Sequence, residues 1–173
     1  MSILIYAESL DGNFKKVAFE LASYAKKVAI SLNTTVTAIT INTDEVSELS
    51  KYGVDKVLKV NDSKIANFNA KAYADVIQQV VKNENSKLVI LSSSTDSLYL
   101  APLLAVMLEA GLTTNVIGLP LNTTPFQVKR TAFSNKAYNI TEISSEIKIL
   151  CLSKNSYGIV ETASNPAIEN FSP

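Results

Sequence analysis

The rest of the chain is arranged around residues 87–112, KLVILSSSTDSLYLAPLLAVMLEAGL. The stretch opens with an unbroken apolar run from Leu88 to Leu91, which is typical of a parallel strand covered on both faces. A loop at 92–97 then carries five hydroxyls and one carboxylate, and a short apolar helix follows it. In an open α/β sheet, ligands bind beyond the carboxyl ends of the strands, where loops lead into helix N-termini. The stretch therefore predicts the binding edge of such a sheet.

The apolar helix of this stretch is expected to start only after the hydroxyl-rich loop. Pro102 has no backbone N–H, and proline is tolerated best in the first turn of a helix. This predicts a start near residues 98–100, with Asp96 or Ser97 as the N-cap. Gly111 suits a left-handed position just beyond the end of the helix.

Strands and amphipathic helices alternate along the preceding part of the chain. Apolar residues recur at helical spacing in two long segments and form unbroken or β-branched runs in the shorter ones. The expected order is a strand at 2–7, a helix from Phe14 to Asn33, a strand at 35–41, a short helix ended by Gly53, a strand at 55–60 and a helix at 69–84. Because crossovers of this length join parallel strands, the pattern predicts an α/β fold, a three-layer α/β/α sandwich around a mostly parallel sheet.

Beyond Pro120 the helical spacing gives way to the alternation of strands. Residues 126–131 alternate between two faces, FSNKAY at 133–138 predicts a turn, and further strands are expected at 137–143 and 147–152. An added antiparallel hairpin is therefore expected near the C-terminus. The last segment, 154–173, has no period and many small polar residues, which predicts a tail or the start of a linker after a domain at 1–153.

Composition excludes several classes of function. Lys plus Arg equals Asp plus Glu at 16 each, so the basic footprint of a nucleic-acid-binding protein is missing. The chain has no histidine, which excludes Ser-His-Asp and Cys-His catalysis and HExxH zinc chemistry. Its five glycines are too far apart to form the dinucleotide-binding motif GxGxxG or the P-loop motif GxxxxGK[ST].

The N-terminal residues indicate the location of the protein, and the surroundings of its single cysteine indicate whether the thiol is reactive. The start of the chain lacks a signal-peptide pattern and no run reaches 18 apolar residues, so we expect a soluble, cytoplasmic protein without direct membrane insertion. Cys151 lies within the apolar run IKILCLS, and we expect a small buried hydrophobe rather than a reactive thiol.

The hydroxyl-rich loop has two interpretations. As an anion or nucleotide site, it would offer backbone N–H groups at a helix N-terminus with hydroxyl donors around them. As a capped loop, it would satisfy its own polar groups, and the absence of any lysine or arginine in it favours this interpretation. The candidate anion-binding residues are Ser94, Thr95, Asp96 and Ser97.

Two residues of the predicted hairpin are candidates for a partner contact. Arg130 and Phe133 are of the residue types that anchor interfaces, although one arginine and one aromatic on an edge hairpin are also commonplace. The acidic residues fall in turns and first helical turns, where capping explains them, and no carboxylate pair indicates acid–base chemistry. We therefore expect no catalytic residue and no metal site.

Six local strings stand in the order of one family. They are ILIYAE, DGxxKKxAxELxSYA, YGVDKV, SSSTxxxxLAPLLAxxLxAGLxTxV, FxxKAYxxxE and IKILxLxxNSYG. On these strings the chain resembles, over most of its length, the amino-terminal domain of the electron-transfer flavoprotein α subunit. The resemblance implies an adenine-nucleotide α-hydrolase-like, Rossmann-like fold.

The resemblance also implies a function. Such a domain docks a β subunit, and the heterodimer carries electrons from acyl-CoA and other flavin dehydrogenases towards a quinone oxidoreductase, as an electron carrier rather than an enzyme. Its FAD is held mainly by a second, carboxyl-terminal domain of the α subunit and by the β subunit. No FAD-binding residue is therefore expected in this chain, which would end near the linker to that domain.

Departures from the family pattern keep a second function open. Ser97, Leu98 and Tyr99 stand where the family tends to have a glycine and small or charged residues, and they add bulk beside any ligand. Asn135 replaces a glycine in the hairpin turn, which should survive because asparagine tolerates positive φ. The alternative is a stand-alone module of the same fold that binds ATP or another nucleotide, and the missing glycine-rich phosphate loop weakens it.

Overall fold

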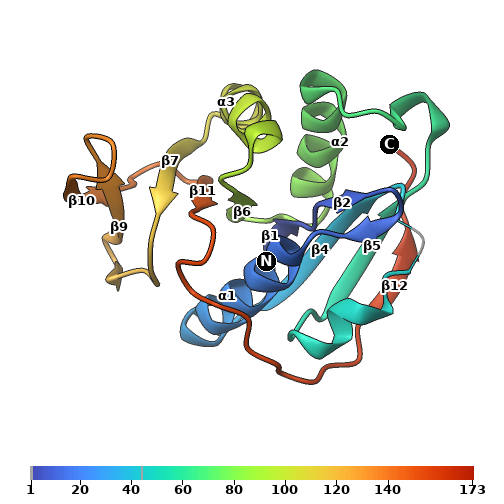
Figure 1. Ribbon diagram of the computed structural model, residues 1–173, viewed down its shortest axis with the longest axis horizontal. Helices are drawn as coiled ribbons and strands as arrows, with labels where there is room; N and C mark the ends of the chain where they lie inside the picture. Colours follow the sequence, from blue (N-terminus) through green and yellow to red (C-terminus); the bar gives the residue numbers. More distant parts are fainter. Residues whose placement is uncertain (1, 44) are drawn as a thin grey trace.

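The computed structural model describes residues 2–43 and 45–173, and these form a mixed sheet between two helical layers (Figure 1). Within these residues the sheet has ten strands, in the order β10-β9-β7-β11-β6-β1-β4-β5-β12, with β8 paired to β9. The strands are β1 (Ser2–Tyr6), β4 (Thr35–Ile41), β5 (Lys56–Val60), β6 (Leu88–Ser92), β7 (Gly111–Val116), β8 (Asn122–Thr123), β9 (Phe126–Ala132), β10 (Ala137–Glu142), β11 (Lys148–Leu152) and β12 (Ala167–Asn170). All neighbours from β7 to β12 pair in parallel, whereas β8, β9 and β10 are antiparallel.

The helices cover both faces of the parallel part of the sheet. α1 (Lys16–Leu32) lies on one face, and α2 (Ala70–Asn83) and α3 (Thr95–Leu108) lie side by side on the other (Figure 1). Two apolar cores result, one on each side of the sheet, and every residue of β1 and β6 is buried. The predicted α/β/α sandwich with an antiparallel hairpin is confirmed.

Shorter elements fill the connections. They are β2 (Ser9–Leu10) and β3 (Asn13–Phe14), which form a small separate hairpin, and the 3-10 helices η1 (Ser47–Lys51) and η2 (Ser63–Ile65). Gly53, which follows η1, adopts the left-handed φ of 81° that the sequence predicts. The predicted end of the first helix is also correct, because Asn33 takes the left-handed position with φ 49°.

The predicted boundaries of α3 were wrong. The helix begins at Thr95, and its N-cap is Ser94, whose hydroxyl accepts the N–H of Ser97 at 3.1 Å. Pro102 therefore lies inside the helix, on its exposed face, where the carbonyl left without a partner can meet water. At the other end Glu109 takes the left-handed position with φ 51°, and Gly111 instead opens β7, a strand that the sequence analysis did not assign.

The β9–β10 hairpin forms at the predicted residues. Ala132 pairs with Ala137 at the turn, and the three residues Phe133, Ser134 and Asn135 all have positive φ, 65° at Asn135. Asn135 thus adopts the positive φ that the turn requires, as predicted for an asparagine that replaces glycine. Figure 1 shows the hairpin beyond the helices, at the opposite end of the sheet from β12.

The final segment does not leave the domain at Leu152. It runs past α1 and returns to the sheet as β12, which pairs in parallel with β5 (Figure 1). Backbone hydrogen bonds fasten it on the way, from the N–H of Thr162 to Lys51 O and from the N–H of Ser164 to Ser50 O, both at 2.7 Å. Residues 154–173, expected as a tail or a linker, thus lie against the domain.

Candidate functional site

A buried carboxylate lies at the predicted binding edge. Glu8 lies two residues beyond the end of β1 and is only 1% exposed. Its Oε1 accepts hydrogen bonds from Ser94 Oγ at 2.9 Å, from Ser97 Oγ at 3.1 Å and from the hydroxyl of Ser92. Three hydroxyls, from the end of β6, the N-cap of α3 and its first turn, therefore converge on one internal anion.

Lys15 balances the charge of this carboxylate. Its Nζ lies 3.2 Å from Glu8 Oε2 and 3.7 Å from Asp96 Oδ2, so it joins the start of α1 to the first turn of α3. A carboxylate can be held in a buried place when an opposite charge and several hydrogen-bond donors surround it, as they do here.

These contacts decide where the four candidate loop residues lie. Ser94 and Ser97 point to Glu8, Asp96 faces Lys15, and Thr95 is exposed at the mouth of a neighbouring cavity. Sequence reasoning missed Glu8, for which the only signal was a charged residue directly after a buried strand. The loop hydroxyls already serve this internal anion, which is the behaviour of a capped, satisfied loop.

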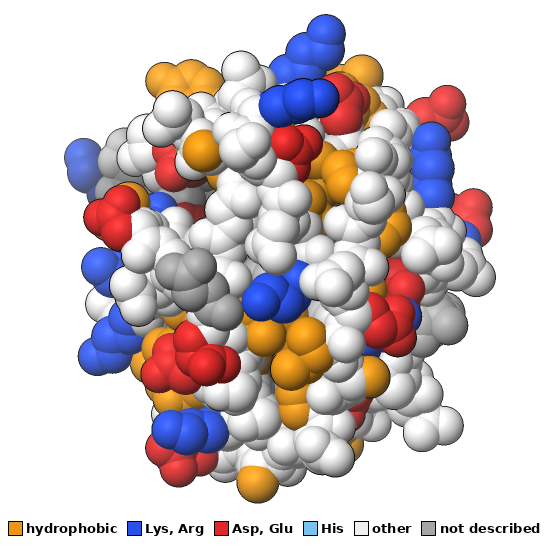
Figure 2. Space-filling model, turned by 90° about the vertical axis from the view of Figure 1, so that its right-hand side faces the viewer, with side chains coloured by type: hydrophobic (Ala, Val, Ile, Leu, Met, Phe, Trp, Pro, Cys, Tyr) orange, Lys and Arg blue, Asp and Glu red, His pale blue; other side chains and the backbone are white. Residues whose placement is uncertain are grey.

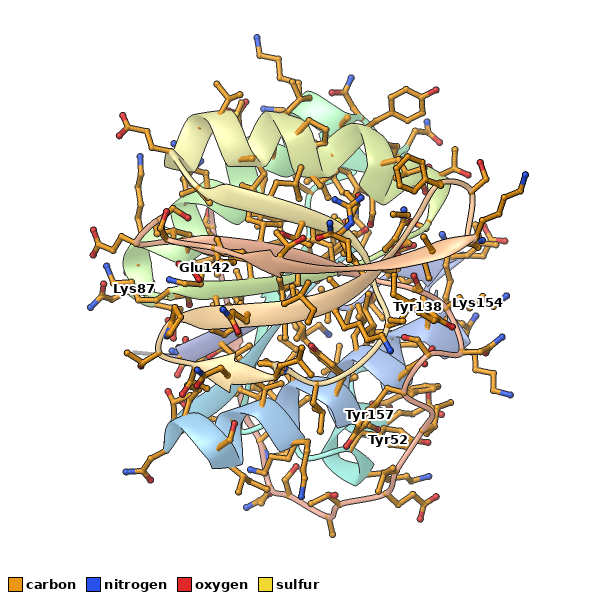
Figure 3. The ribbon with its side chains drawn as sticks, turned by 90° about the vertical axis from the view of Figure 1, so that its left-hand side faces the viewer. Tyr52, Lys87, Tyr138, Glu142, Lys154 and Tyr157 are labelled. Carbon is orange, nitrogen blue, oxygen red and sulfur yellow. The ribbon has the colours of Figure 1, made fainter. Side chains whose placement is uncertain are left out.

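Cations nevertheless lie beside the loop. A cavity of about 490 Å³ adjoins the cluster, and its lining includes the lysines Lys15, Lys16 and Lys154. The loop itself contains no lysine or arginine, and these lysines come from the start of α1 and from the segment after β11. Lys154 is labelled in Figure 3.

A second internal anion holds the segment that follows β11. Glu20, on α1, is buried, and its carboxylate accepts the backbone N–H groups of Asn155 at 2.9 Å and of Tyr157 and Gly158 at 3.0 Å. Burial alone would raise the pKa of Glu20, but these N–H donors together lower it below its ordinary value. Tyr157, labelled in Figure 3, adds an edge-on contact with Tyr24 at 5.5 Å between ring centroids.

The hairpin exposes large apolar side chains. Phe133 at its tip is 82% exposed, and Tyr138 and Ile140 on β10 are 67% and 62% exposed. Figure 3 views the molecule from this end, with Tyr138 and Glu142 labelled on β10. We call Phe133, Tyr138 and Ile140 the hairpin surface.

The structure brings the two predicted partner residues together. Arg130 and Phe133 line one cavity of about 310 Å³ beside the hairpin turn. Arg130 is partly buried, with one guanidinium nitrogen 3.4 Å from Thr114 Oγ1, and its Nε is buried without a hydrogen-bond partner among the described residues. Phe133 instead projects into solvent.

Neither a reactive thiol nor a metal cluster stands out in the part of the chain that the structure describes. Cys151 is fully buried, as the sequence predicts, and burial raises the pKa of its thiol to about 12. Among residues 2–43 and 45–173, no three metal-ligating side chains come together, and no helix is long and apolar enough to span a membrane.

Comparison with models of known families identifies the family of this chain. The family model described as the electron transfer flavoprotein domain matches residues 3–173. The chain belongs to the electron transfer flavoprotein family. The resemblance predicted from six local strings is thereby confirmed.

The relatives of this electron transfer flavoprotein domain include α subunits of electron transfer flavoproteins and an electron-transfer subunit of an acryloyl-CoA reductase. The chain is 30% identical over 147 residues to the electron transfer flavoprotein subunit alpha of Syntrophomonas wolfei, with 82% of this chain and 44% of that protein covered. It is 28% identical to the subunit alpha of Bacillus subtilis, covering 79% and 42%. It is 27% identical to the acryloyl-CoA reductase electron transfer subunit beta of Anaerotignum propionicum, covering 69% and 34%. The chain thus matches less than half the length of these relatives.

Proposed function

We propose that this chain is the amino-terminal, α-type domain of an electron transfer flavoprotein and that its role is to dock a β subunit. In the heterodimer FAD carries the electrons, since hydride and electron transfer are the chemistry of the flavin and the protein supplies binding and orientation. The complex accepts electrons from acyl-CoA and other flavin dehydrogenases and delivers them to a quinone oxidoreductase. The chain is an electron-carrier subunit and not a catalyst by itself.

The hairpin surface is the observation that supports docking. Phe133, Tyr138 and Ile140 are each more than 60% exposed on one hairpin, which projects beyond the helical layers. Clustered exposed apolar side chains of this size mark interaction sites on soluble proteins, and aromatic residues are enriched at the centres of interfaces. Arg130, partly buried beside them, adds a further residue type of interface anchors.

The two edges of the sheet differ in a way that supports the same assignment. β10 is the last strand at the hairpin end, so the outer row of its backbone groups faces no strand of the described chain. At the other end β12 carries Glu169, whose carboxylate pairs with Lys56 at 3.1 Å. Figure 2 views the molecule from the β12 end and shows acidic and basic side chains interspersed over that face. Charged side chains on an edge strand disfavour pairing with another strand. β10 carries one such side chain, Glu142 at its end, and no ion pair among the described residues involves the hairpin.

The larger cavity at the binding edge does not fit an isoalloxazine ring. The cavity of about 490 Å³ at the binding edge is lined by lysines, hydroxyl residues and the Glu8 carboxylate, with Val17 as its apolar member. A flavin site needs an extended apolar wall with a few placed polar groups. We therefore assign FAD to the rest of the heterodimer and derive no redox step on this chain.

The test is to mix the purified chain with the electron transfer flavoprotein β subunit of the same organism. Size-exclusion chromatography with light scattering should show a species of summed mass, and the chain alone should elute without flavin absorbance. Two separate peaks at micromolar concentrations, or a chain that stays yellow by itself after gel filtration, would contradict the proposal.

A further inference from the structure

The outward side of α3 is apolar although it is exposed. Val106 is 80% exposed, Tyr99 66% and Leu98 51%, and Pro102 and Leu103 are exposed beside them. These five residues lie one and four positions apart, so they share one face of the helix. The helix carries no charged residue beyond its first turn. We call Leu98, Tyr99, Pro102, Leu103 and Val106 the α3 surface.

The neighbouring helix α2 has an ordinary outward side. α2 and α3 lie side by side on the same face of the sheet (Figure 1), and both bury an apolar side against it. The exposed residues of α2 are nevertheless polar or charged, among them Lys71, Asp75, Gln79 and Lys82. A helix with apolar residues on all sides is typical of one that is covered all round. The α3 surface therefore indicates a contact outside the described chain.

Part of the hairpin surface lies on the same side of the sheet as α3. Val128 on β9 is buried in the core beneath α1, and side chains alternate along a strand. Lys129 and its cross-strand partner Ile140 therefore lie on the opposite side, together with Tyr138, whose ring centroid is 4.1 Å from Lys129 Nζ. β7 pairs with β9 and also contacts α3, so it joins the two surfaces (Figure 1).

The combined area distinguishes between possible partners. The hairpin surface exposes on the order of 450 Å² of side chain, and the α3 surface exposes on the order of 500 Å². A stable interface buries about 800 Å² on each partner. Neither surface reaches this area alone, so a second copy of the chain that paired through α3 would be bound only weakly. The two surfaces together do reach it, which favours one partner that covers both.

We propose that the β subunit covers the α3 surface as well as the hairpin surface, through an uncharged, apolar part of its own surface. The inference rests on the docking function proposed above and extends it to a second element. The one charged residue of α3, Asp96, is paired with Lys15 at the start of the helix. A charged group of the partner would lose its hydration against the α3 surface without meeting an opposite charge. Apolar complementarity is therefore what selects the partner at this surface.

The variant Tyr99→Gln/Val106→Gln tests the contact, because it changes the two most exposed side chains of the α3 surface and keeps the net charge. In calorimetric titration of the 173-residue chain with the β subunit of the same organism, it should bind about tenfold more weakly or worse than the wild type, as expected when anchor residues are lost. Asp75→Gln/Lys82→Gln is the matched control, since it places the same residue at two exposed positions of α2 and also keeps the net charge. The control should bind as the wild type does, and both variants should unfold as the wild type does.

The hairpin variant Phe133→Ser/Tyr138→Ser/Ile140→Ser separates this inference from docking itself. Loss of affinity in this variant and in Tyr99→Gln/Val106→Gln, but not in the control, supports both. If the hairpin variant loses affinity while Tyr99→Gln/Val106→Gln binds as the wild type does, docking stands and the α3 contact is overturned. If the wild-type chain does not bind the β subunit, both are overturned.

Sedimentation of the chain without the β subunit tests for a second copy as the occupant. The wild type should sediment as a monomer at micromolar concentrations. A dimer that Tyr99→Gln/Val106→Gln disperses would assign the α3 surface to a second copy and overturn the proposal.

Thiol labelling adds a direct measurement of the contact, because Cys151, the chain's own cysteine, is buried. A maleimide should modify Val106→Cys in the free chain and leave it unmodified in the complex, whereas Asp75→Cys on α2 should react in both. Equal reaction of Val106→Cys in the free chain and in the complex would overturn the α3 contact.

Discussion

Glu8 Oε1 accepts a hydrogen bond from Ser97 Oγ at 3.1 Å, across 89 positions of sequence. The contact ties the end of β1 to the first turn of α3, and Ser94 makes a parallel contact at 2.9 Å. The loop that has the sequence signature of an anion site therefore encloses an anion supplied by the protein itself.

Glu8→Gln should destabilise the fold by about 1–3 kcal/mol, because the neutral amide is a weaker acceptor for the three hydroxyls at Oε1 and places an NH2 group where Oε2 accepts from Lys15. Glu8→Ala should cost more, about 3–5 kcal/mol, since it leaves a lysine and three hydroxyls around an empty site. Urea unfolding followed by circular dichroism measures both. Glu161→Gln changes an exposed carboxylate and serves as the control, expected within about 0.5 kcal/mol of the wild type. Equal stability of Glu8→Gln and the control would show that the cluster contributes nothing to the fold.

Glu20→Gln should loosen the segment that follows β11. The native pKa of Glu20 is lowered, so its charged form stabilises the fold above the unfolded-state pKa of about 4.3, and this contribution is lost as pH falls through the native pKa. The difference in unfolding free energy between wild type and Glu20→Gln should be about 1–3 kcal/mol at pH 7 and should shrink below pH ~4. Limited proteolysis should also cut Glu20→Gln faster near Asn155 to Val160. A pH-independent difference would refute the role of the charge.

Cys151 should be inert in the native protein. Its side chain is fully buried and its pKa is raised to about 12, so almost no thiolate exists at pH 8 and the reagent cannot reach it. An aromatic disulfide reagent should give no absorbance change with native protein and one thiol per chain in urea. A rapid native reaction would place Cys151 near the surface and contradict the packing of β11.

Periodic segments of the sequence were predictable because their structure is decided locally. The stripe of Tyr73, Ile77 and Val80 predicts α2, and its N-cap Asn69 accepts the N–H of Ala72 at 3.0 Å. The start of α3 was mispredicted because several adjacent hydroxyls could cap it, and Ser94 was not favoured by any local pattern.

Other features depend on contacts between distant residues. β12 shows no apolar periodicity because all four of its residues are exposed. Backbone pairing with β5 holds this strand in the sheet. Glu8 and Lys154 reach the loop only after β1 and β11 lie beside β6, so no spacing in the sequence reveals them. The lysines beside the loop, Lys15, Lys16 and Lys154, lie far from it in the sequence for the same reason.

The affinity of the hairpin surface for the β subunit tests the central claim most directly. The variant Phe133→Ser/Tyr138→Ser/Ile140→Ser changes only exposed side chains, and Leu10→Ser/Ile168→Ser is its control, with residues 65% and 51% exposed away from the hairpin. Both variants should unfold as the wild type does. If the hairpin docks the partner, the triple variant should bind the β subunit about a hundredfold more weakly or worse, since interface anchors each contribute about 2 kcal/mol or more, while the control keeps its affinity. Wild-type affinity in the triple variant would contradict the account.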